Sequence, residues 1–162
     1  MDRKFDEVVE HLKIMVRYWN ETVICLIHID YSRFLFQLRD KKPGIPFSGH
    51  YGAFGGSIED GESPRVACIR ELEEEIGFVP RKLGFFRDYW IAEHDVHVHV
   101  FHGSLTIPLS DLCLSEGMDL GLFHKTDIFS SQLFSEKFSQ FFPVIPNLVG
   151  FLKEFCKSLP GK

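Results

Sequence analysis

Residues 55–78 read GGSIEDGESPRVACIRELEEEIGF, and the second half of this stretch carries the local signals of an α-helix. Ser63 followed by Pro64 is typical of a helix start, with serine as the N-cap and proline in the first turn. Gly77 is typical of a helix end, because glycine readily adopts the left-handed backbone that closes a helix. The sequence therefore predicts a helix from Ser63 to about Ile76.

Three glutamates of this predicted helix are spaced so that they gather on one side. Glu71, Glu74 and Glu75 stand at positions i, i+3 and i+4, which are neighbours on a helix surface. Like charges repel there, so the spacing favours a bound cation, and carboxylate oxygens suit a hard divalent ion such as Mg²⁺. The alternative is a solvated acidic helix face. Apolar side chains fall on the opposite face and can pack against a sheet: Ile69, Leu72 and Ile76.

A longer pattern encloses the helix. Written with gaps, it is Gly56-x5-Glu62-x7-Arg70-Glu71-Leu72-x-Glu74-Glu75-x-Gly77-Phe78. This pattern resembles the Nudix box, G-x5-E-x7-R-E-U-x-E-E-x-G-U, in which U is a bulky apolar residue. All nine specified positions match, with the correct spacing over 23 residues. A pattern of this length, with agreeing strand, loop and helix context, resembles the Nudix hydrolase family specifically.

The resemblance implies a fold, a reaction and a set of site residues. The fold would be an α/β/α sandwich with a mixed β-sheet, in the α/β (α+β) class. The substrate would be a nucleoside diphosphate linked to another moiety, and water bound to Mg²⁺, or to Mn²⁺, would attack a phosphorus atom. Arg70 would orient the glutamates, and Glu62 would order the loop or bind an outer metal. The metal ligands would be Glu71, Glu74, Glu75 and the carbonyl of Gly56.

The general base and the substrate are less closely defined by the box. Glu71 is one candidate base, and Glu116 is another, because its loop resembles the one that carries a glutamate in MutT-like 8-oxo-dGTP diphosphatases. Glu116 would then also bind metal; its alternative role is that of an exposed loop acid. Phe54 stands where many family members have proline before the paired glycines, and we expect it to contact substrate.

The resemblance leaves three functions open. The first is MutT-like hydrolysis of a nucleoside triphosphate or other nucleoside diphosphate derivative. The second is hydrolysis of a nucleoside diphosphate sugar. The third is a non-catalytic nucleotide-binding sensor, which is disfavoured because a binder has no need of an electrostatically costly ligand set.

Strands and helices alternate along the rest of the chain. Strands are predicted at residues 22–30, 34–39, 83–92, 96–105 and 120–123. Helices are predicted at residues 131–141 and 147–155, and an amphipathic helix is predicted at about residues 1–20. That first helix would pack on the domain, or alternatively form a homodimer contact. We expect residues 1–162 to form a single Nudix hydrolase domain.

Composition narrows the class of partner and the compartment. The chain has 18 lysines and arginines against 23 acidic residues, so its net charge of −5 disfavours a nucleic-acid partner and leaves a small-molecule nucleotide. The longest apolar run, residues 23–27, is too short to cross a membrane, and we expect no secretory signal because the first residues are charged and lack an apolar segment. The four cysteines form no C-x-x-C pair and indicate reduced thiols, which predicts a cytoplasmic protein.

Three weaker signals lie outside the box. His97 and His99, within a histidine-rich segment from His94 to His102, share one face of a predicted strand. They could bind zinc but lack a third ligand, so a polar face lining the substrate cleft is favoured. Asn147 precedes the last helix and could read a purine edge, although an N-cap is favoured. The 17 phenylalanines fill the core or offer a base-stacking surface.

Overall fold

A six-stranded mixed sheet forms the centre of the computed structural model, which describes residues 20–160. The strands are β1 (Glu21–Ile29), β2 (Arg33–Leu38), β3 (Tyr51–Gly52), β4 (Gly84–Ile91), β5 (Val96–Ser104) and β6 (Asp119–His124). Their order is β3-β2-β1-β5-β4, and β6 also pairs with β2. β1 and β5 are parallel, whereas the other pairs in this sheet are antiparallel. The helix predicted for residues 1–20 lies outside the described residues.

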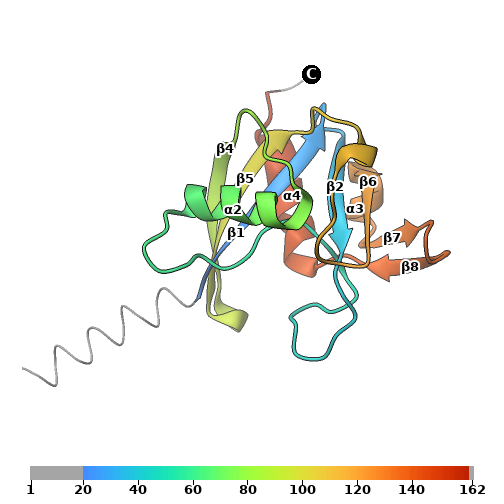
Figure 1. Cartoon of the computed structure of the whole chain (residues 1–162), viewed down its shortest axis with the longest axis horizontal. Coiled ribbons are helices and arrows are strands. Elements are labelled where there is room, and N and C mark those ends of the chain that lie inside the picture. Colours follow the sequence, from blue (N-terminus) through green and yellow to red (C-terminus); the bar gives the residue numbers. More distant parts are fainter. Residues whose placement is uncertain (1–19, 161–162) are drawn as a thin grey trace, which may run out of the picture.

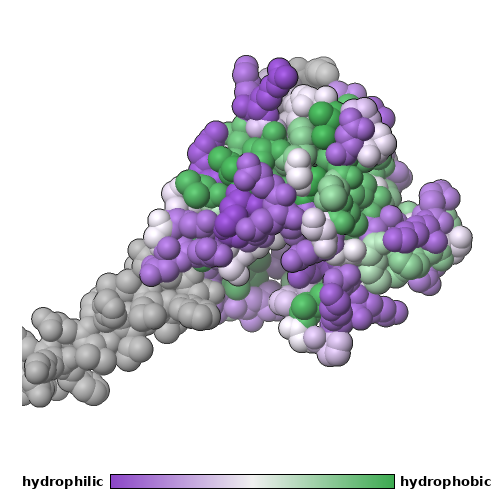
Figure 2. Space-filling model, viewed as in Figure 1, coloured by the Kyte–Doolittle hydropathy of each residue, from purple (hydrophilic) through white to green (hydrophobic). Residues whose placement is uncertain are grey.

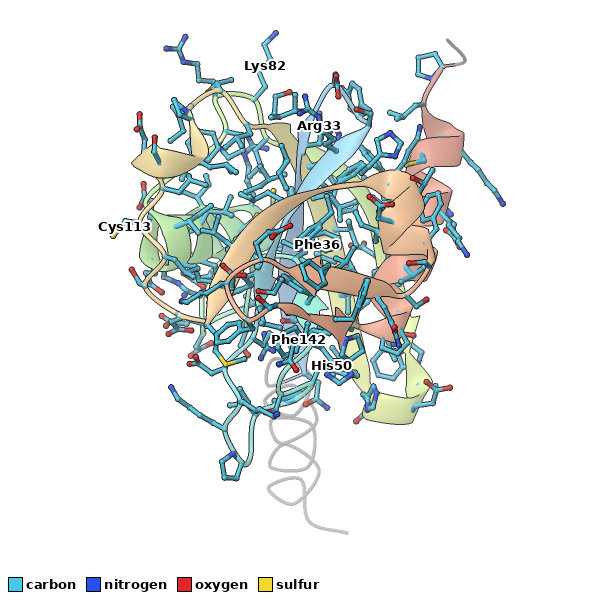
Figure 3. All side chains as sticks on the ribbon, turned by 90° about the vertical axis from the view of Figure 1, so that its right-hand side faces the viewer. Arg33, Phe36, His50, Lys82, Cys113 and Phe142 are labelled. Carbon is cyan, nitrogen blue, oxygen red and sulfur yellow. The ribbon has the colours of Figure 1, made fainter. Side chains whose placement is uncertain are left out.

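Helices cover both faces of the sheet. Figure 1 shows α2 (Pro64–Ile76) in front of the strands and α4 (Pro146–Ser158) behind them. Alternate side chains of each strand point to opposite faces, so the sheet divides the apolar interior into two clusters. Phe36 and Phe142, labelled in Figure 3, belong to the cluster under α4, and Leu72 and Ile76 belong to the one under α2. The predicted α/β/α sandwich with a mixed sheet is confirmed.

The ends of α2 are those that its sequence predicts. The Oγ of Ser63 accepts a hydrogen bond from the Val66 N–H at 3.3 Å, as an N-cap does. Gly77 has a φ of 64° and its N–H donates to the Glu73 carbonyl, which ends the helix in the left-handed conformation. The remaining short helices are α3 (Lys125–Phe129) and two 3₁₀ turns, η1 (Ala92–His94) and η2 (Leu109–Asp111). None of the helices within residues 20–160 is long and apolar enough to cross a membrane.

The helix predicted at residues 131–141 is wrong. This segment forms a hairpin of β7 (Gln132–Ser135) and β8 (Gln140–Pro143), which Figure 1 shows beside the main sheet. Leu133 faces Phe142 in the core, while the rings of Phe134 and Phe141 pair on the exposed side with centroids 5.2 Å apart. Aromatic cross-strand pairs favour a hairpin, and they outweighed the helical spacing of the same residues.

Candidate active site

The loop before α2 and the last turns of α2 place a carboxylate inside the protein. The side chain of Glu75 is only 5% exposed, and its two oxygens accept hydrogen bonds from Gln37 Nε2 at 2.9 Å and from the Gly55 N–H at 2.8 Å. Burial raises the pKa of Glu75 to about 7, although both donors favour the charged form. The charged form of a buried carboxylate is stabilised when a cation approaches it.

Glu71 lies one turn before Glu75 on the same side of α2 and faces Gly56. A Cβ atom added to Gly56 would lie 2.6 Å from the Glu71 carboxylate, so a larger residue at position 56 would displace that group. Burial raises the pKa of Glu71 despite the favourable contact with Arg70. The Gly56 carbonyl accepts hydrogen bonds from the Val23 N–H at 2.9 Å and from Thr22 Oγ1 at 2.7 Å. As a metal ligand, that carbonyl would have to release one of these bonds.

Arg70 connects the loop to the carboxylates of α2. Its guanidinium makes a two-point contact with Glu62 at 2.8 and 2.9 Å, and its Nη1 reaches Glu71 at 2.7 Å and Glu74 at 3.2 Å. Glu62 also accepts a bond from the Glu59 N–H, and the Arg70 contacts lower its pKa to about 2. Arg70 thus fixes the directions in which the carboxylates point, and Glu62 orders the loop.

The three glutamates of the helix do not share one environment, although their spacing predicted a common face. Glu75 is buried with Leu72 and Ile76, Glu71 is partly buried, and the side chain of Glu74 is 60% exposed. Figure 2 shows the hydrophilic surface that α2 presents on the side away from the sheet. The helix therefore carries a gradient of exposure, with Glu75 at its inner edge and Glu74 at its outer edge.

A cavity of about 530 Å³ opens beside Glu75. The loop from β5 to β6 closes one side, because Ser115 N–H donates to the Glu75 carbonyl and Met118 N–H donates to the Leu38 carbonyl, both at 2.8 Å. This loop brings Glu116 to the cavity wall, where its charge adds to the effect of burial on the pKa values of Glu71 and Glu75. The loop thus brings Glu116 near Glu71 and Glu75, and its metal binding and its role as a base stay predictions.

Of the predicted site residues, Glu75 and Glu116 line this cavity, whereas the lining does not include Gly56, Arg70, Glu71 or Glu74. Phe54 is fully buried in the apolar cluster under α2, so its ring has no exposed surface to offer a substrate. Asn147 occupies the second position of α4, whose N-cap is Ile145; the favoured role of Asn147 as a cap is therefore wrong. Its side chain is partly exposed and remains a predicted purine contact. The cavity lining includes none of the histidines of residues 94–102.

Sequence reasoning predicted Glu75 and Glu116 as site residues but missed the other residues of the cavity lining, among them Gln37, Arg39 and Lys42. Gln37 is 2% exposed and supports Glu75, and its signal was a lone polar residue inside the apolar strand β2. Arg39, at the end of the predicted strand 34–39, and Lys42, in the segment after it, add positive charge to the same wall, which also includes Asp40. Lys42 Nζ bonds Asp40 Oδ2 at 2.7 Å, a contact that raises the pKa of Lys42. Arg39 and Lys42 are the cationic residues of a lining that also contains the acidic Asp40, Glu75 and Glu116.

The carboxylates of this wall fit a hard divalent cation. Glu75 and Glu116 line the cavity, and Glu71 lies one turn before Glu75 on α2, so oxygen atoms from two segments are available. Pairing with positive charge would stabilise the buried carboxylates of Glu71 and Glu75. Glu62 is saturated by Arg70 and the Glu59 N–H, and therefore fits a supporting role better than that of a ligand. The donor set is entirely oxygen, which favours Mg²⁺ or Mn²⁺ over softer ions.

Comparison with known proteins agrees with this architecture. The family model described as the NUDIX domain matches residues 19–123, and the chain belongs to this family of hydrolases. An ADP-ribose pyrophosphatase of Methanocaldococcus jannaschii is 33% identical over 60 residues, 37% of this chain and 36% of that protein. An 8-oxo-dGTP diphosphatase of Escherichia coli is 41% identical over 44 residues, 27% of this chain and 34% of that protein. The matched segments thus span about a third of each relative.

Solved structures show the same fold at lower identity. The MutT NUDIX hydrolase of Burkholderia pseudomallei superposes with a TM-score of 0.61 at 20% identity, covering 83% of this chain and 95% of that one. The NUDIX domain of Shewanella oneidensis NrtR, crystallised with ADP ribose, gives a TM-score of 0.67 at 15% identity and covers 99% and 100% of the two chains. These structures establish the MutT-like fold of the chain.

Proposed function

We propose that this protein hydrolyses the diphosphate linkage of a nucleoside triphosphate or another nucleoside diphosphate derivative, with Mg²⁺ as its metal. The observation that carries the proposal is the buried carboxylate of Glu75, which lines a polar cavity together with Glu116 and whose pKa is raised further by the charges of Glu71 and Glu116. Such a set is costly for the fold unless a cation and an anionic ligand occupy it. Mn²⁺ would suit the same oxygen donors.

The residues of the wall have distinct roles in this proposal. Glu71, Glu75 and Glu116 hold the cation, with Glu74 joining from the outer edge of the helix, and Arg70 keeps the helix carboxylates in position. Bound Mg²⁺ neutralises charge on the phosphate oxygens and lowers the pKa of water. Glu71 or Glu116 accepts the proton of the attacking water. Both carboxylates lie near Glu75, and neither takes part in the two-point contact that Arg70 makes with Glu62.

Arg39 and Lys42 favour a substrate with several phosphate charges. Both side chains line the same cavity as Glu75 and Glu116, and a polyphosphate bound through a cation could contact them, with Lys42 exchanging its present contact with Asp40. We therefore place nucleoside triphosphates first, in keeping with the diphosphatase among the relatives. A nucleoside diphosphate sugar is the second candidate, and the pyrophosphatase that acts on ADP-ribose, among the relatives, supports it.

A substrate panel tests the proposal. The protein with Mg²⁺ is incubated with nucleoside triphosphates, including an oxidised guanine nucleotide, and with nucleotide sugars, and products are followed by ³¹P NMR. Cleavage within the diphosphate linkage is expected for at least one class, and the class cleaved fastest assigns the substrate. Tight nucleotide binding without hydrolysis of any compound would instead identify a sensor and overturn the proposal.

A further inference from the structure

A second group of side chains of metal-binding types lies at the start of β1, which is the end farther from the turn between β1 and β2. Two of the three histidines of β5, His97 and His99, point to the same face of the sheet, and their ring centroids are 5.2 Å apart. The parallel pairing of β1 with β5 sets Glu21 directly opposite His97. Glu21 is thus the third ligand that the histidine spacing alone lacked.

The three side chains converge on a common point. Glu21 Oε1 lies 4.0 Å from His97 Nδ1, and Glu21 Oε2 lies 3.9 Å from His99 Nε2. All three ligand atoms fall within 4.8 Å of one another. Ligand atoms around a tetrahedral zinc ion at about 2.0 Å lie about 3.3 Å apart, so small side-chain rotations are sufficient to close the site. These separations are too long for direct hydrogen bonds.

A carboxylate on the neighbouring strand orients one of the histidines. Asp88 of β4 pairs with His99 of β5, and its Oδ1 lies 2.6 Å from His99 Nδ1. A carboxylate accepts a hydrogen bond, so Nδ1 carries the proton and Nε2 presents its lone pair. Nε2 is buried and has no hydrogen-bond partner in the described part of the chain. Carboxylate-bound histidines with a free second nitrogen are the usual arrangement at protein-bound zinc.

This cluster is separate from the acidic wall of the cavity, although one loop borders both. This loop contains Gly56 and, two residues later, Ile58, whose N–H donates a hydrogen bond to the Glu21 carbonyl. The donor sets differ, because the cavity wall offers only oxygens whereas this cluster offers two imidazole nitrogens and one carboxylate. Imidazole suits Zn²⁺ and related transition metals, and Mg²⁺ prefers oxygen. The two positions are therefore expected to select different ions.

We propose that Glu21, His97 and His99 form a site for Zn²⁺ or a similar divalent transition metal, with water completing the coordination and Asp88 as a positioning residue. The ion would join the first residues of β1 and β5, where Asn20 Nδ2 also donates a hydrogen bond to Asp95 Oδ2 at 3.0 Å. Metal binding at this site does not depend on the hydrolysis proposed above.

Metal titration in the presence of saturating Mg²⁺ tests the site. The full-length protein with Cys113→Ser, which removes an exposed thiol, is titrated with Co²⁺ as a spectroscopic substitute and with Zn²⁺ by calorimetry. One equivalent is expected to bind, with the visible absorption of Co²⁺ in a site of low coordination number. His97→Gln and His99→Gln are each expected to weaken binding at least tenfold. Asp88→Asn is expected to weaken it ten- to hundredfold through His99.

Matched variants decide whether the effect belongs to this cluster. His94→Gln removes a histidine three residues away, outside the cluster, and is expected to leave the affinity unchanged. Glu21→Gln changes a partly exposed residue and provides a further test if a histidine variant fails to fold. Absence of Zn²⁺ binding by the parent protein, affinity retained in His99→Gln, or equal loss in His94→Gln would each overturn the proposal. An ion pair between an imidazolium and the two carboxylates would produce the first of these results.

Discussion

The two long helices begin alike and are used differently. Both α2 and α4 have 13 residues, start with proline, and pack on opposite faces of one sheet. α4 buries only apolar side chains: Leu148, Val149, Leu152 and Phe155. α2 buries a carboxylate, Glu75, among its apolar residues. The helix α4 therefore contributes mainly to stability, whereas α2 gives up part of that contribution to hold a charged site.

The largest expected effect is a loss of turnover on substitution of Glu75 but not of Glu73, another glutamate of α2. Replacing Glu75 with glutamine keeps its shape and removes the charge that faces the cavity, so turnover should fall about a thousandfold, or about 4 kcal/mol. Glu73→Gln is the matched control, because Glu73 is exposed on the same helix. Steady-state kinetics on the substrate found in the panel measures both. A loss of less than tenfold in Glu75→Gln would remove Glu75 from the site.

The next prediction concerns α4. Leu152 is completely buried, and Leu152→Ala should lower the free energy of unfolding by about 2–5 kcal/mol through lost packing and a residual cavity. Urea denaturation measures this change. Turnover of the folded fraction should stay within twofold, because α4 lies on the far side of the sheet from the cavity. If Leu152→Ala keeps full stability but loses activity, the conclusion that α4 contributes mainly to stability would be wrong.

The α4 face also contains a buried histidine with a predictable pH effect. Burial, with a smaller contribution from His102, lowers the pKa of His28 to about 4, although Asp30 opposes the shift. The unfolded chain therefore binds more protons between about pH 4 and 6.5, and His28 contributes stability that is lost as pH falls through this range. His28→Phe keeps a ring against Tyr31 and should reduce this loss by about 2 kcal/mol.

The comparison of parent and variant measures the contribution of His28 alone. Glu75, whose pKa is raised, changes stability in the opposite direction. Between pH 4.5 and about 7 the folded state keeps a proton on Glu75 that the unfolded chain has lost, so the contribution of Glu75 to stability falls as pH rises. Denaturation at several pH values without divalent metal, on the parent and on His28→Phe, supplies the difference. Parallel curves for the two proteins would contradict the assignment.

A smaller effect is expected at Arg70. Lysine keeps the charge but loses the planar fork that contacts Glu62 and Glu71 together, so Arg70→Lys should reduce turnover about ten- to hundredfold. Circular dichroism checks that the helix persists. Activity equal to that of the parent would show that the directions of the carboxylates do not depend on this residue.

The smallest expected effect is at the start of α2. Ser63→Ala removes the acceptor of the Val66 N–H and should cost about 1 kcal/mol of stability. Ser63→Asp is the control, because aspartate also caps helices and its charge favours the N-terminal end. Thermal denaturation distinguishes the two. Equal destabilisation by both substitutions would argue against the cap.

Prediction from sequence succeeded where local signals act alone. α2 begins and ends as expected because Ser63 and Gly77 act through their own backbone neighbours. The strands β1, β2, β4, β5 and β6 also fall where alternation and β-branched residues predicted them. The segment 131–141 was misassigned because its aromatic spacing suits a helix as well as a hairpin, and the choice depended on packing of Leu133 and Phe142 against the core.

The sequence by itself determined the class of protein, since the box from Gly56 to Phe78 fixes residue types at short separations along one loop and one helix. Only the tertiary structure decided the environment of those residues. Gln37 reaches Glu75 across 38 positions, and Glu21 meets His97 through strands that are parallel neighbours. Burial and long-range pairing depend on how the sheet is assembled, and no local pattern in the chain specifies them.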